Sequence, residues 1–162
     1  MKVVIGIFLA IFLMGPAASR AGSGRQSDTI EVDYDSRVVG RWLERNSDAV
    51  EESTGAHVVK TVGDVVTLRK ETKHGVQIFR LRREGGNGLY RAAFVDRSAG
   101  ELTDYTYEIR LSPLSDHRTE ITVTMTAATE KAYGVSVNIE LRKSIRGLRS
   151  FLQEHLLRRE TP

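Results

Sequence analysis

The most chemically suggestive residues of the chain are two tyrosines, Tyr105 and Tyr107, which stand two positions apart in a strictly alternating stretch over residues 102–111. Alternate residues of a strand point to opposite faces of a sheet, so the two phenol groups share one face. The same face carries Thr103, Tyr105, Tyr107, Ile109 and Leu111. Because this set is largely apolar, we expect it to face the interior, where each hydroxyl needs a hydrogen-bond partner from protein, water or ligand.

Other reactive groups show no arrangement typical of catalysis. The chain has no cysteine, which excludes thiol chemistry and cysteine-ligated metals. Its four histidines are scattered at His57, His74, His117 and His155. They lack the spacing of a helical or zinc-finger site, so we expect neither a metal nor another cofactor. Glu51 and Glu52 are adjacent carboxylates on a predicted short helix, and we interpret them as a solvated helix face and not as an acid and base pair.

Two groups of arginines offer positive charge. One lies on a predicted strand and comprises Arg80, Arg82 and Arg83; the other follows the helical period near the C-terminus and comprises Arg142, Arg146 and Arg149. If Phe79 and Leu81 face the interior, Arg80 lies on the surface. The opposite register would bury Arg80 as an anchor for a carboxylate or phosphate. We interpret the helical stripe as a solvated face, with a weak contact to anionic lipid headgroups at a membrane surface as the alternative.

The N-terminus resembles a secretory signal peptide over residues 1–21. Lys2 precedes about 12 apolar residues, and Ser19 and Ala21 form a small-x-small cleavage site. An apolar run of this length falls short of the roughly 20 residues that cross a bilayer, which favours cleavage over a membrane anchor. We therefore expect a mature protein that is secreted or periplasmic.

The mature chain is nearly neutral. Removing residues 1–21 takes away Lys2 and Arg20, which leaves 22 basic side chains against 21 acidic ones. Such a balanced surface is not that of a nucleic-acid-binding protein. Residues 22–28 are mostly Gly, Ser, Arg and Gln and predict a flexible leader. The remaining residues, 29–158, suit one domain that buries its core without disulfides.

The order of elements predicts an α+β domain. A first strand over residues 29–34 precedes two short helices, one capped by Ser36 and one over residues 48–52. Alternating or apolar runs then predict strands over residues 58–62, 65–70, 76–83, 89–95, 102–111 and 119–127. The glycine-rich segment 84–88 joins two of these strands, so we interpret it as a hairpin turn and not as a phosphate-binding loop.

A long amphipathic helix that ends near Leu157 closes the domain. Its apolar residues recur every three or four positions, at Val137, Leu141, Ile145, Leu148, Leu152 and Leu156. Such a stripe must pack against another apolar surface, and the inner face of the strands is the largest one that the chain offers. We therefore predict a curved antiparallel sheet of about six to seven strands wrapped around the C-terminal helix.

This order resembles that of the START-like superfamily, also called SRPBCC, of polyketide cyclases and lipid-transport proteins, whose helix-grip fold wraps such a sheet around a terminal helix. The resemblance covers residues 28–157 and includes the segment from Glu140 to Leu152, with its Gly147-Leu148 step. It implies a cavity between sheet and helix that holds a lipid, a sterol, a polyketide or another largely apolar molecule. It implies no catalytic residue, because the superfamily has no invariant catalytic signature.

The predicted inner face combines apolar walls with a few hydroxyls, as small-molecule pockets do. Its candidate ligand-binding residues are Phe79, Tyr90, Phe94, Tyr105, Tyr107 and Met125. The alternative is that these side chains are simply core. The leading hypothesis is an exported, non-enzymatic protein that binds a hydrophobic or amphipathic small molecule, such as a lipid. Two alternatives stay open: a cyclase or hydrolase-type enzyme with a cavity tyrosine or histidine as acid or base, and a cavity-less domain that acts through its surface.

Overall fold

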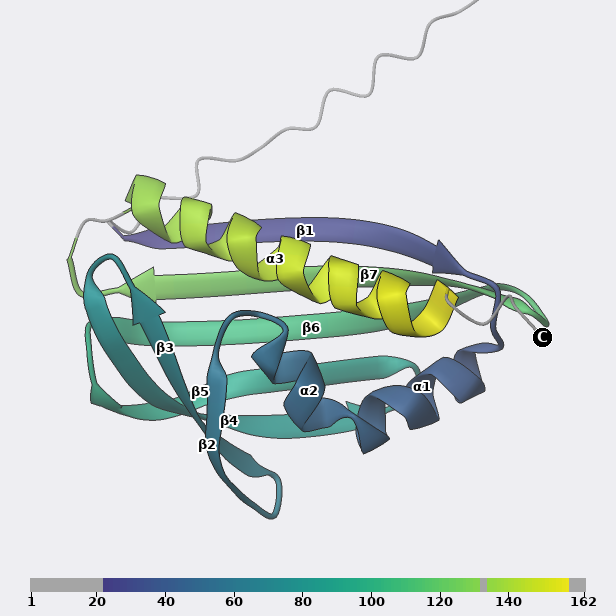
Figure 1. Cartoon of the computed structure of the whole chain (residues 1–162), viewed down its shortest axis with the longest axis horizontal. Coiled ribbons are helices and arrows are strands. Elements are labelled where there is room, and N and C mark those ends of the chain that lie inside the picture. The colour runs from purple at the N-terminus through teal and green to yellow at the C-terminus, as the bar shows by residue number, and fades with distance from the viewer. Residues whose placement is uncertain (1–21, 132–133, 158–162) are drawn as a thin grey trace, which may run out of the picture.

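A single antiparallel sheet dominates the computed structural model, which describes residues 22–131 and 134–157 (Figure 1). Its seven strands follow the order β1-β7-β6-β5-β4-β3-β2. The strands are β1 (Ser23–Val32), β2 (His57–Val62), β3 (Val65–Thr72), β4 (Gly75–Gly86), β5 (Leu89–Ala99), β6 (Leu102–Ser115) and β7 (Arg118–Thr129). The helices are α1 (Ser36–Arg45), α2 (Ser47–Glu52) and α3 (Gly134–Leu157).

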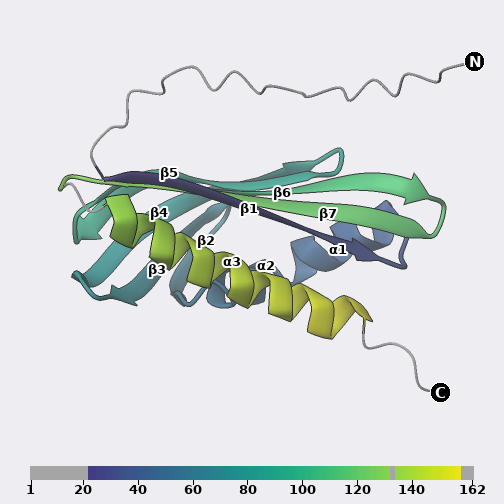
Figure 2. The ribbon, with the colours of Figure 1, turned by 90° about the horizontal axis from the view of Figure 1, so that it is seen from above.

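All three helices lie on one face of the sheet. The long helix α3 runs across that face over β1 and β7, and α1 and α2 lie beside it (Figure 1). Seen from above, β2 and β3 curve towards the helices, so the sheet is concave on the helical side (Figure 2). The predicted α+β arrangement, a curved antiparallel sheet around a long C-terminal helix with two short helices after the first strand, is confirmed.

The apolar stripe of α3 faces the sheet as predicted. All six of its residues are buried, and Leu148 and Leu152 are 0% exposed. Close approach of α3 to α2 depends on Gly147, where a Cβ atom would lie 2.2 Å from the Ser53 carbonyl oxygen. Within the described part of the chain, none of the helices combines the length and the hydropathy needed to span a bilayer.

The first strand begins earlier than predicted. Residues 23–28, expected to belong to a flexible leader, form the first part of β1 and pair with β7. Backbone hydrogen bonds stabilise an edge strand whatever its side chains are, and Ser27 Oγ adds a bond to the Val123 carbonyl at 3.0 Å. The polar composition of this segment therefore reflects an edge strand, and the folded domain starts before residue 29.

The two short helices form where the sequence predicts them, with a different cap on the first. Asp35, and not Ser36, caps α1: its carboxylate accepts a hydrogen bond from the Arg37 backbone N–H at 2.7 Å. A carboxylate is favoured there because it satisfies a free N–H group and faces the positive end of the helix dipole. The segment 84–88 makes the predicted hairpin turn, in which Asn87 and Gly88 have positive φ angles of 52° and 75°.

A bulge in β6 decides which of its side chains face inward. The register between β6 and β7 shifts between Leu102 and Asp104. Leu102 is therefore buried and Thr103 is exposed, which corrects the predicted inward position of Thr103. Beyond the bulge, Tyr105 and Tyr107 take the predicted buried positions and are each 5% exposed.

Candidate functional site

One cavity, which we call the α3 pocket, lies between the first half of α3 and one end of the sheet. Strands β3, β4, β6 and β7 supply one wall, and α3 supplies the other. Residues that define it include Lys70, Phe79, Tyr105, Ala127, Val137 and Leu141. Nearly all of its exposed lining is apolar, and a water-sized sphere can be placed over about 70 Å³ of the cavity, within a hollow of about 620 Å³ that includes open solvent. The pocket is suited to an apolar group that enters from solvent.

Phe79 and Tyr105 form the aromatic part of the wall. Their ring centroids are 5.4 Å apart, with the planes tilted by 51°. The Tyr105 hydroxyl points to the Met125 sulfur at 4.0 Å, which is a weak acceptor. Burial raises the pKa of Tyr105 to about 12, although a hydrogen bond with Thr54 opposes the rise. Tyr105 is therefore a neutral hydroxyl near pH 7 and is better suited to hydrogen bonding than to proton transfer.

Lys70 lines the α3 pocket, and its amine is buried between α2 and α3. It is 9% exposed, and its Nζ donates to the Thr54 carbonyl at 2.7 Å and to Ser144 Oγ at 2.6 Å. Burial is the main reason that the pKa of Lys70 falls from 10.5 to about 8; Lys143 adds to the fall, and Glu140 opposes it. The arrangement joins β3 to the end of α2 and to the middle of α3, and it puts positive charge beside an apolar cavity.

A second buried polar cluster, formed by Glu51, Arg83 and Tyr107, lies under α2. Glu51 is 0% exposed, and its carboxylate accepts hydrogen bonds from Arg83 Nε at 2.8 Å and from the Tyr107 hydroxyl at 3.0 Å. The prediction that Glu51 belongs to a solvated helix face is therefore wrong, because its side of α2 faces the sheet. Its neighbour Glu52 is exposed, and Arg83 also pairs with Asp48 at the rim.

This cluster is an ion pair with a neutral hydroxyl beside it. Burial raises the pKa of the Glu51 carboxyl, although the bonds from Arg83 and Tyr107 oppose the rise. The hydrogen bond to Glu51 raises the pKa of the Arg83 guanidinium. Burial, reinforced by the Glu51 charge, holds the pKa of Tyr107 well above its ordinary value. Paired guanidinium and carboxylate groups satisfy each other, so the cluster stabilises the packing of α2 on β4 and β6.

A second pocket adjoins this cluster, between α1, α2 and strands β4 to β6. Its empty space is about 590 Å³ when the part open to solvent is included. Tyr90 lies in its wall and donates from its hydroxyl to Glu44 at 3.4 Å. Gly40 of α1 makes room for that hydroxyl, because a Cβ atom there would lie 2.4 Å from it. Arg83, which pairs with Glu51, is part of the wall of this second pocket.

Comparison with solved structures identifies the architecture. The chain is similar to a START superfamily protein from Mycobacterium smegmatis, with a TM-score of 0.63 and 13% identity over 82% of this chain and 97% of that one. It is also similar to a protein from Thermus thermophilus, with a TM-score of 0.62 and 14% identity over 85% of this chain and 100% of that one. An aromatase/cyclase from a Streptomyces species matches with a TM-score of 0.52 and 12% identity, over 83% of this chain and 87% of that one.

The chain has the START-like helix-grip fold. The order of strands and helices on which the resemblance in the sequence was based is therefore confirmed by the structure. No protein-family model matches the chain, and no curated protein matches it in sequence.

In this START-like fold, the predicted ligand-binding residues divide between the two pockets. Phe79 and Tyr105 line the α3 pocket, whereas Tyr90 and Tyr107 line the second pocket. Met125 is fully buried beside the Tyr105 hydroxyl, and Phe94 packs half-buried against the core. The two hydroxyls singled out by their spacing therefore line different pockets, and that of Tyr107 donates to Glu51.

Arg80 of β4 and the arginines of the predicted α3 stripe are surface groups, whereas Arg83 of β4 belongs to the buried cluster under α2. Phe79 and Leu81 face the interior, so Arg80 lies on the outer face of the sheet and pairs with Asp96. On α3, Arg149 pairs with Asp28 of β1 at 3.0 Å, and its neighbours on the predicted stripe, Arg142 and Arg146, are exposed. The register that would have made Arg80 a buried anion anchor does not occur. The buried cation of the α3 pocket is Lys70, on the adjacent strand.

Proposed function

We propose that this START-like protein binds a hydrophobic or amphipathic small molecule in the α3 pocket. The observation that carries the proposal is the apolar lining of a cavity between the sheet and α3 that opens to solvent. Phe79, Tyr105 and Leu141 offer aromatic and aliphatic surface to an apolar group. Burying such a group there contributes about 25 cal/mol for each Å² of apolar surface removed from water, which makes the pocket a favourable site for a lipid-like molecule.

We propose binding without catalysis, and an enzyme is the alternative. An acid or base that acts on a bound molecule must reach it and must change its protonation near the working pH. In the α3 pocket, Tyr105 keeps its proton, since its pKa is raised to about 12. Lys70, whose pKa falls to about 8, is the group of this pocket that an enzyme could use as acid or base. Beside the second pocket, the Glu51 carboxylate is engaged by Arg83 and Tyr107. The aromatase/cyclase that is similar in fold keeps the enzyme hypothesis as the alternative.

The proposal includes export of the protein. Residues 1–21 lie outside the described residues, and the support comes from their sequence: a basic start, a short apolar run and a small-x-small site before residue 22. Expression in a host with a general secretion pathway, followed by N-terminal sequencing of the exported protein, tests this part. A mature N-terminus close to residue 22 is expected, whereas protein that stays in the cytoplasm with Met1 intact contradicts export.

A neutral fluorescent probe tests the binding proposal. N-phenyl-1-naphthylamine should gain fluorescence on binding to the wild-type protein. Ser136→Trp places a bulky side chain in the wall of the α3 pocket and should weaken binding by tenfold or more. Ser150→Trp makes the same change at an exposed position of the same helix and should leave binding unchanged. Absence of probe binding to the wild type, or equal binding to both variants, would contradict the assignment to this pocket.

Native mass spectrometry of the protein, purified without detergent from its own host, then identifies the bound molecule. A stoichiometric apolar passenger is the expected result. A consistently empty protein that also fails to bind the neutral probe would favour the cavity-less interpretation, in which the domain acts through its surface.

A further inference from the structure

Lys70 is the feature of the α3 pocket that apolar binding alone does not explain. Its side chain leaves β3 on the same face as Val66 and Leu68, which are both buried. It ends between α2 and α3, where its Nζ donates to the Thr54 carbonyl at 2.7 Å and to Ser144 Oγ at 2.6 Å. Burying an ammonium costs several kcal/mol unless an opposite charge compensates it, so the charge of its partners decides how costly Lys70 is.

Both partners of this ammonium are uncharged. In the described part of the chain, no carboxylate forms an ion pair with Lys70 within 4.0 Å. Glu140, the acidic residue whose charge acts most strongly on Lys70, is paired with Lys143 at 3.1 Å. Ser144 is itself oriented by a hydrogen bond from its Oγ to the Glu140 carbonyl at 2.9 Å, so its oxygen presents a lone pair to Lys70.

The third donor of the ammonium has no hydrogen-bond partner among the described residues. An ammonium group has three N–H donors, and two of them are used by Thr54 and Ser144. Lys70 lines the α3 pocket, whose other walls near it are Phe79, Tyr105 and Leu141. A molecule in the pocket therefore meets apolar surface along most of its length and one positive charge where Lys70 ends.

We infer that Lys70 binds the carboxylate of an amphipathic, monoanionic ligand whose apolar part lies against Phe79, Tyr105 and Leu141. This inference rests on the proposed function and names the chemical class of its ligand. A carboxylate would accept a charge-assisted hydrogen bond and supply the missing counter-charge. A single negative charge fits best, because Glu101 and Glu140 also line the pocket and would repel a dianion such as a phosphate monoester.

The state of the ammonium makes binding depend on pH. Burial lowers the pKa of Lys70 to about 8, so the charged form that a carboxylate needs is lost above that value. Affinity for a carboxylate should then fall about tenfold for each pH unit above 8. The other titratable groups at this pocket are His74 in the β3–β4 turn, Glu101 before β6, Tyr105 on β6, and Glu140 with Lys143 on α3.

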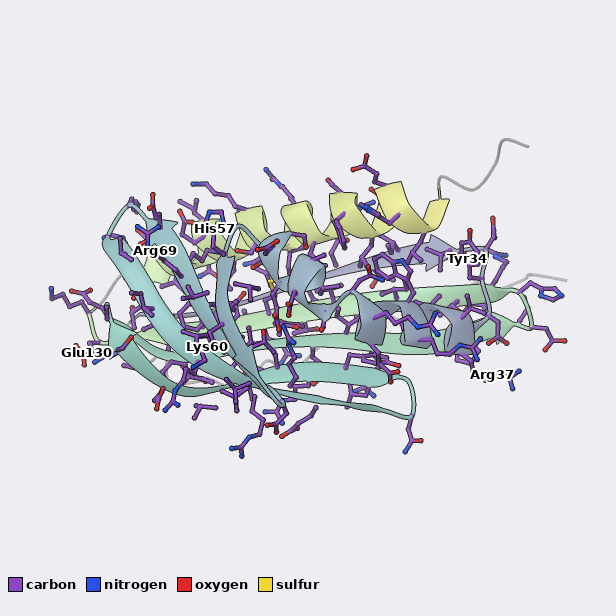
Figure 3. All side chains as sticks on the ribbon, turned by 60° about the horizontal axis from the view of Figure 1, so that its bottom comes forward. Tyr34, Arg37, His57, Lys60, Arg69 and Glu130 are labelled. Atoms are coloured by element: carbon purple, nitrogen blue, oxygen red, sulfur yellow. The ribbon has the colours of Figure 1, made fainter. Side chains whose placement is uncertain are left out.

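A competition experiment with two matched molecules tests the inference. Decanoate and decan-1-ol share a ten-carbon chain and differ in head-group charge, and each displaces N-phenyl-1-naphthylamine from the protein if it binds in the pocket. Three proteins are compared: wild type, Lys70→Met, and Lys60→Met. Lys60 lies on the edge strand β2 with an exposed side chain, so its variant loses an amine outside the pocket (Figure 3).

We expect the effect of removing Lys70 to depend on the charge of the ligand's head group. Near pH 7, Lys70→Met should bind decanoate at least tenfold more weakly than wild type and bind decan-1-ol equally well, since only decanoate loses a charge-assisted hydrogen bond. Lys60→Met should behave as wild type with both molecules. Between pH 7 and pH 9, wild type should lose about tenfold in affinity for decanoate and none for decan-1-ol.

Failure of this inference and failure of the proposed function give different results. If wild type binds neither the fluorescent probe nor decan-1-ol, the proposed function fails, and the inference falls with it. If wild type and Lys70→Met bind both molecules with equal affinities, the pocket binds apolar ligands and the role of Lys70 is overturned. If Lys70→Met does not fold, the wild-type pH profile decides: an affinity for decanoate that is constant from pH 7 to pH 9 overturns the inference.

Discussion

The buried ammonium of Lys70 should make the folded protein more stable as the solution becomes alkaline. In the unfolded chain this lysine has its ordinary pKa of 10.5, and in the fold burial lowers the pKa to about 8. Between these values the unfolded chain binds more protons than the folded one, so stability rises with pH. Below pH 8 both states are protonated, and the folded state carries the full cost of the buried charge.

The size of this effect follows from the two pKa values. Each pKa unit corresponds to about 1.4 kcal/mol, so a fall from 10.5 to about 8 amounts to about 3 kcal/mol over the whole range. Most of it, about 2 to 3 kcal/mol, should be gained between pH 7 and pH 10. Other groups titrate in this range, including tyrosines that ionise on unfolding, so the effect must be read as a difference between two proteins.

Urea unfolding of wild type and Lys70→Met near pH 7 and pH 10 measures that difference. Methionine has a similar shape and no charge, so the free energy of unfolding of the Lys70→Met variant lacks the lysine contribution. The difference in free energy of unfolding between wild type and Lys70→Met should shift in favour of the wild type by about 2 to 3 kcal/mol from pH 7 to pH 10. The difference between wild type and the exposed variant Lys60→Met should change far less, because both proteins keep Lys70. A relative stability that stays constant, or that falls with pH, would refute the conclusion that Lys70 is charged and buried in the fold.

Three further substitutions test the packing around α2. Arg83→Met should cost about 3 to 5 kcal/mol of stability in urea unfolding, because it leaves the fully buried Glu51 unpaired; a smaller loss in the double variant with Glu51→Gln would confirm the coupling, and equal losses would contradict it. Tyr107→Phe removes one hydrogen bond to Glu51 and should cost about 1 to 2 kcal/mol, with no change in the m-value; a neutral effect would mean that this bond adds nothing. Gly147→Ala places a Cβ atom 2.2 Å from the Ser53 carbonyl oxygen, so melting temperature should fall by an amount that corresponds to about 1 to 3 kcal/mol, and an unchanged melting temperature would show that α3 can move away.

The fold was predictable because its apolar patterns are long and regular. The stripe of α3 keeps the helical period over many turns, and its residues from Val137 to Leu156 are buried. The alternation in β6 and β7 fixes which face is inward, except where the bulge at Leu102 and Asp104 shifts the register. A bulge depends on how the neighbouring strand is paired, which the sequence of one strand does not contain.

The start of the domain was predicted less well for a similar reason. Residues 23–28 have the composition of a flexible segment, yet they form part of β1. The partner that orders them, β7, lies about a hundred residues away in the chain, as the bond from Ser27 to Val123 shows. Composition records how much apolar surface a segment can bury by itself, and it does not record backbone hydrogen bonds offered by a distant strand.

The charged residues of the two pockets were the hardest to predict. Lys70 continues the alternation of Val66 and Leu68, so the period of the strand did indicate an inward position for it. A lysine is rarely buried without a partner, so its charge normally argues for an exposed side chain even where the alternation of the strand indicates an inward one. Glu51 posed the same difficulty on a helix too short to show a period, and only the fold brings Arg83 and Tyr107 to it.

The two buried charges differ in one respect, and that difference separates a structural role from a binding role. Both lie beside α2: Glu51 belongs to its last turn, and Lys70 donates to the carbonyl of Thr54, just beyond that turn. The charge of Glu51 is compensated within the protein by Arg83, so removing either partner mainly costs stability. Lys70 is held only by the uncharged acceptors of Thr54 and Ser144, and it lines an apolar cavity. Lys70 has no ion-pair partner in the part of the chain that the structure describes, and the charge of Glu140 offsets the cost of its burial only in part. A ligand carboxylate would therefore add stability, so the pH dependence of stability without ligand and the pH dependence of carboxylate binding should both trace to Lys70.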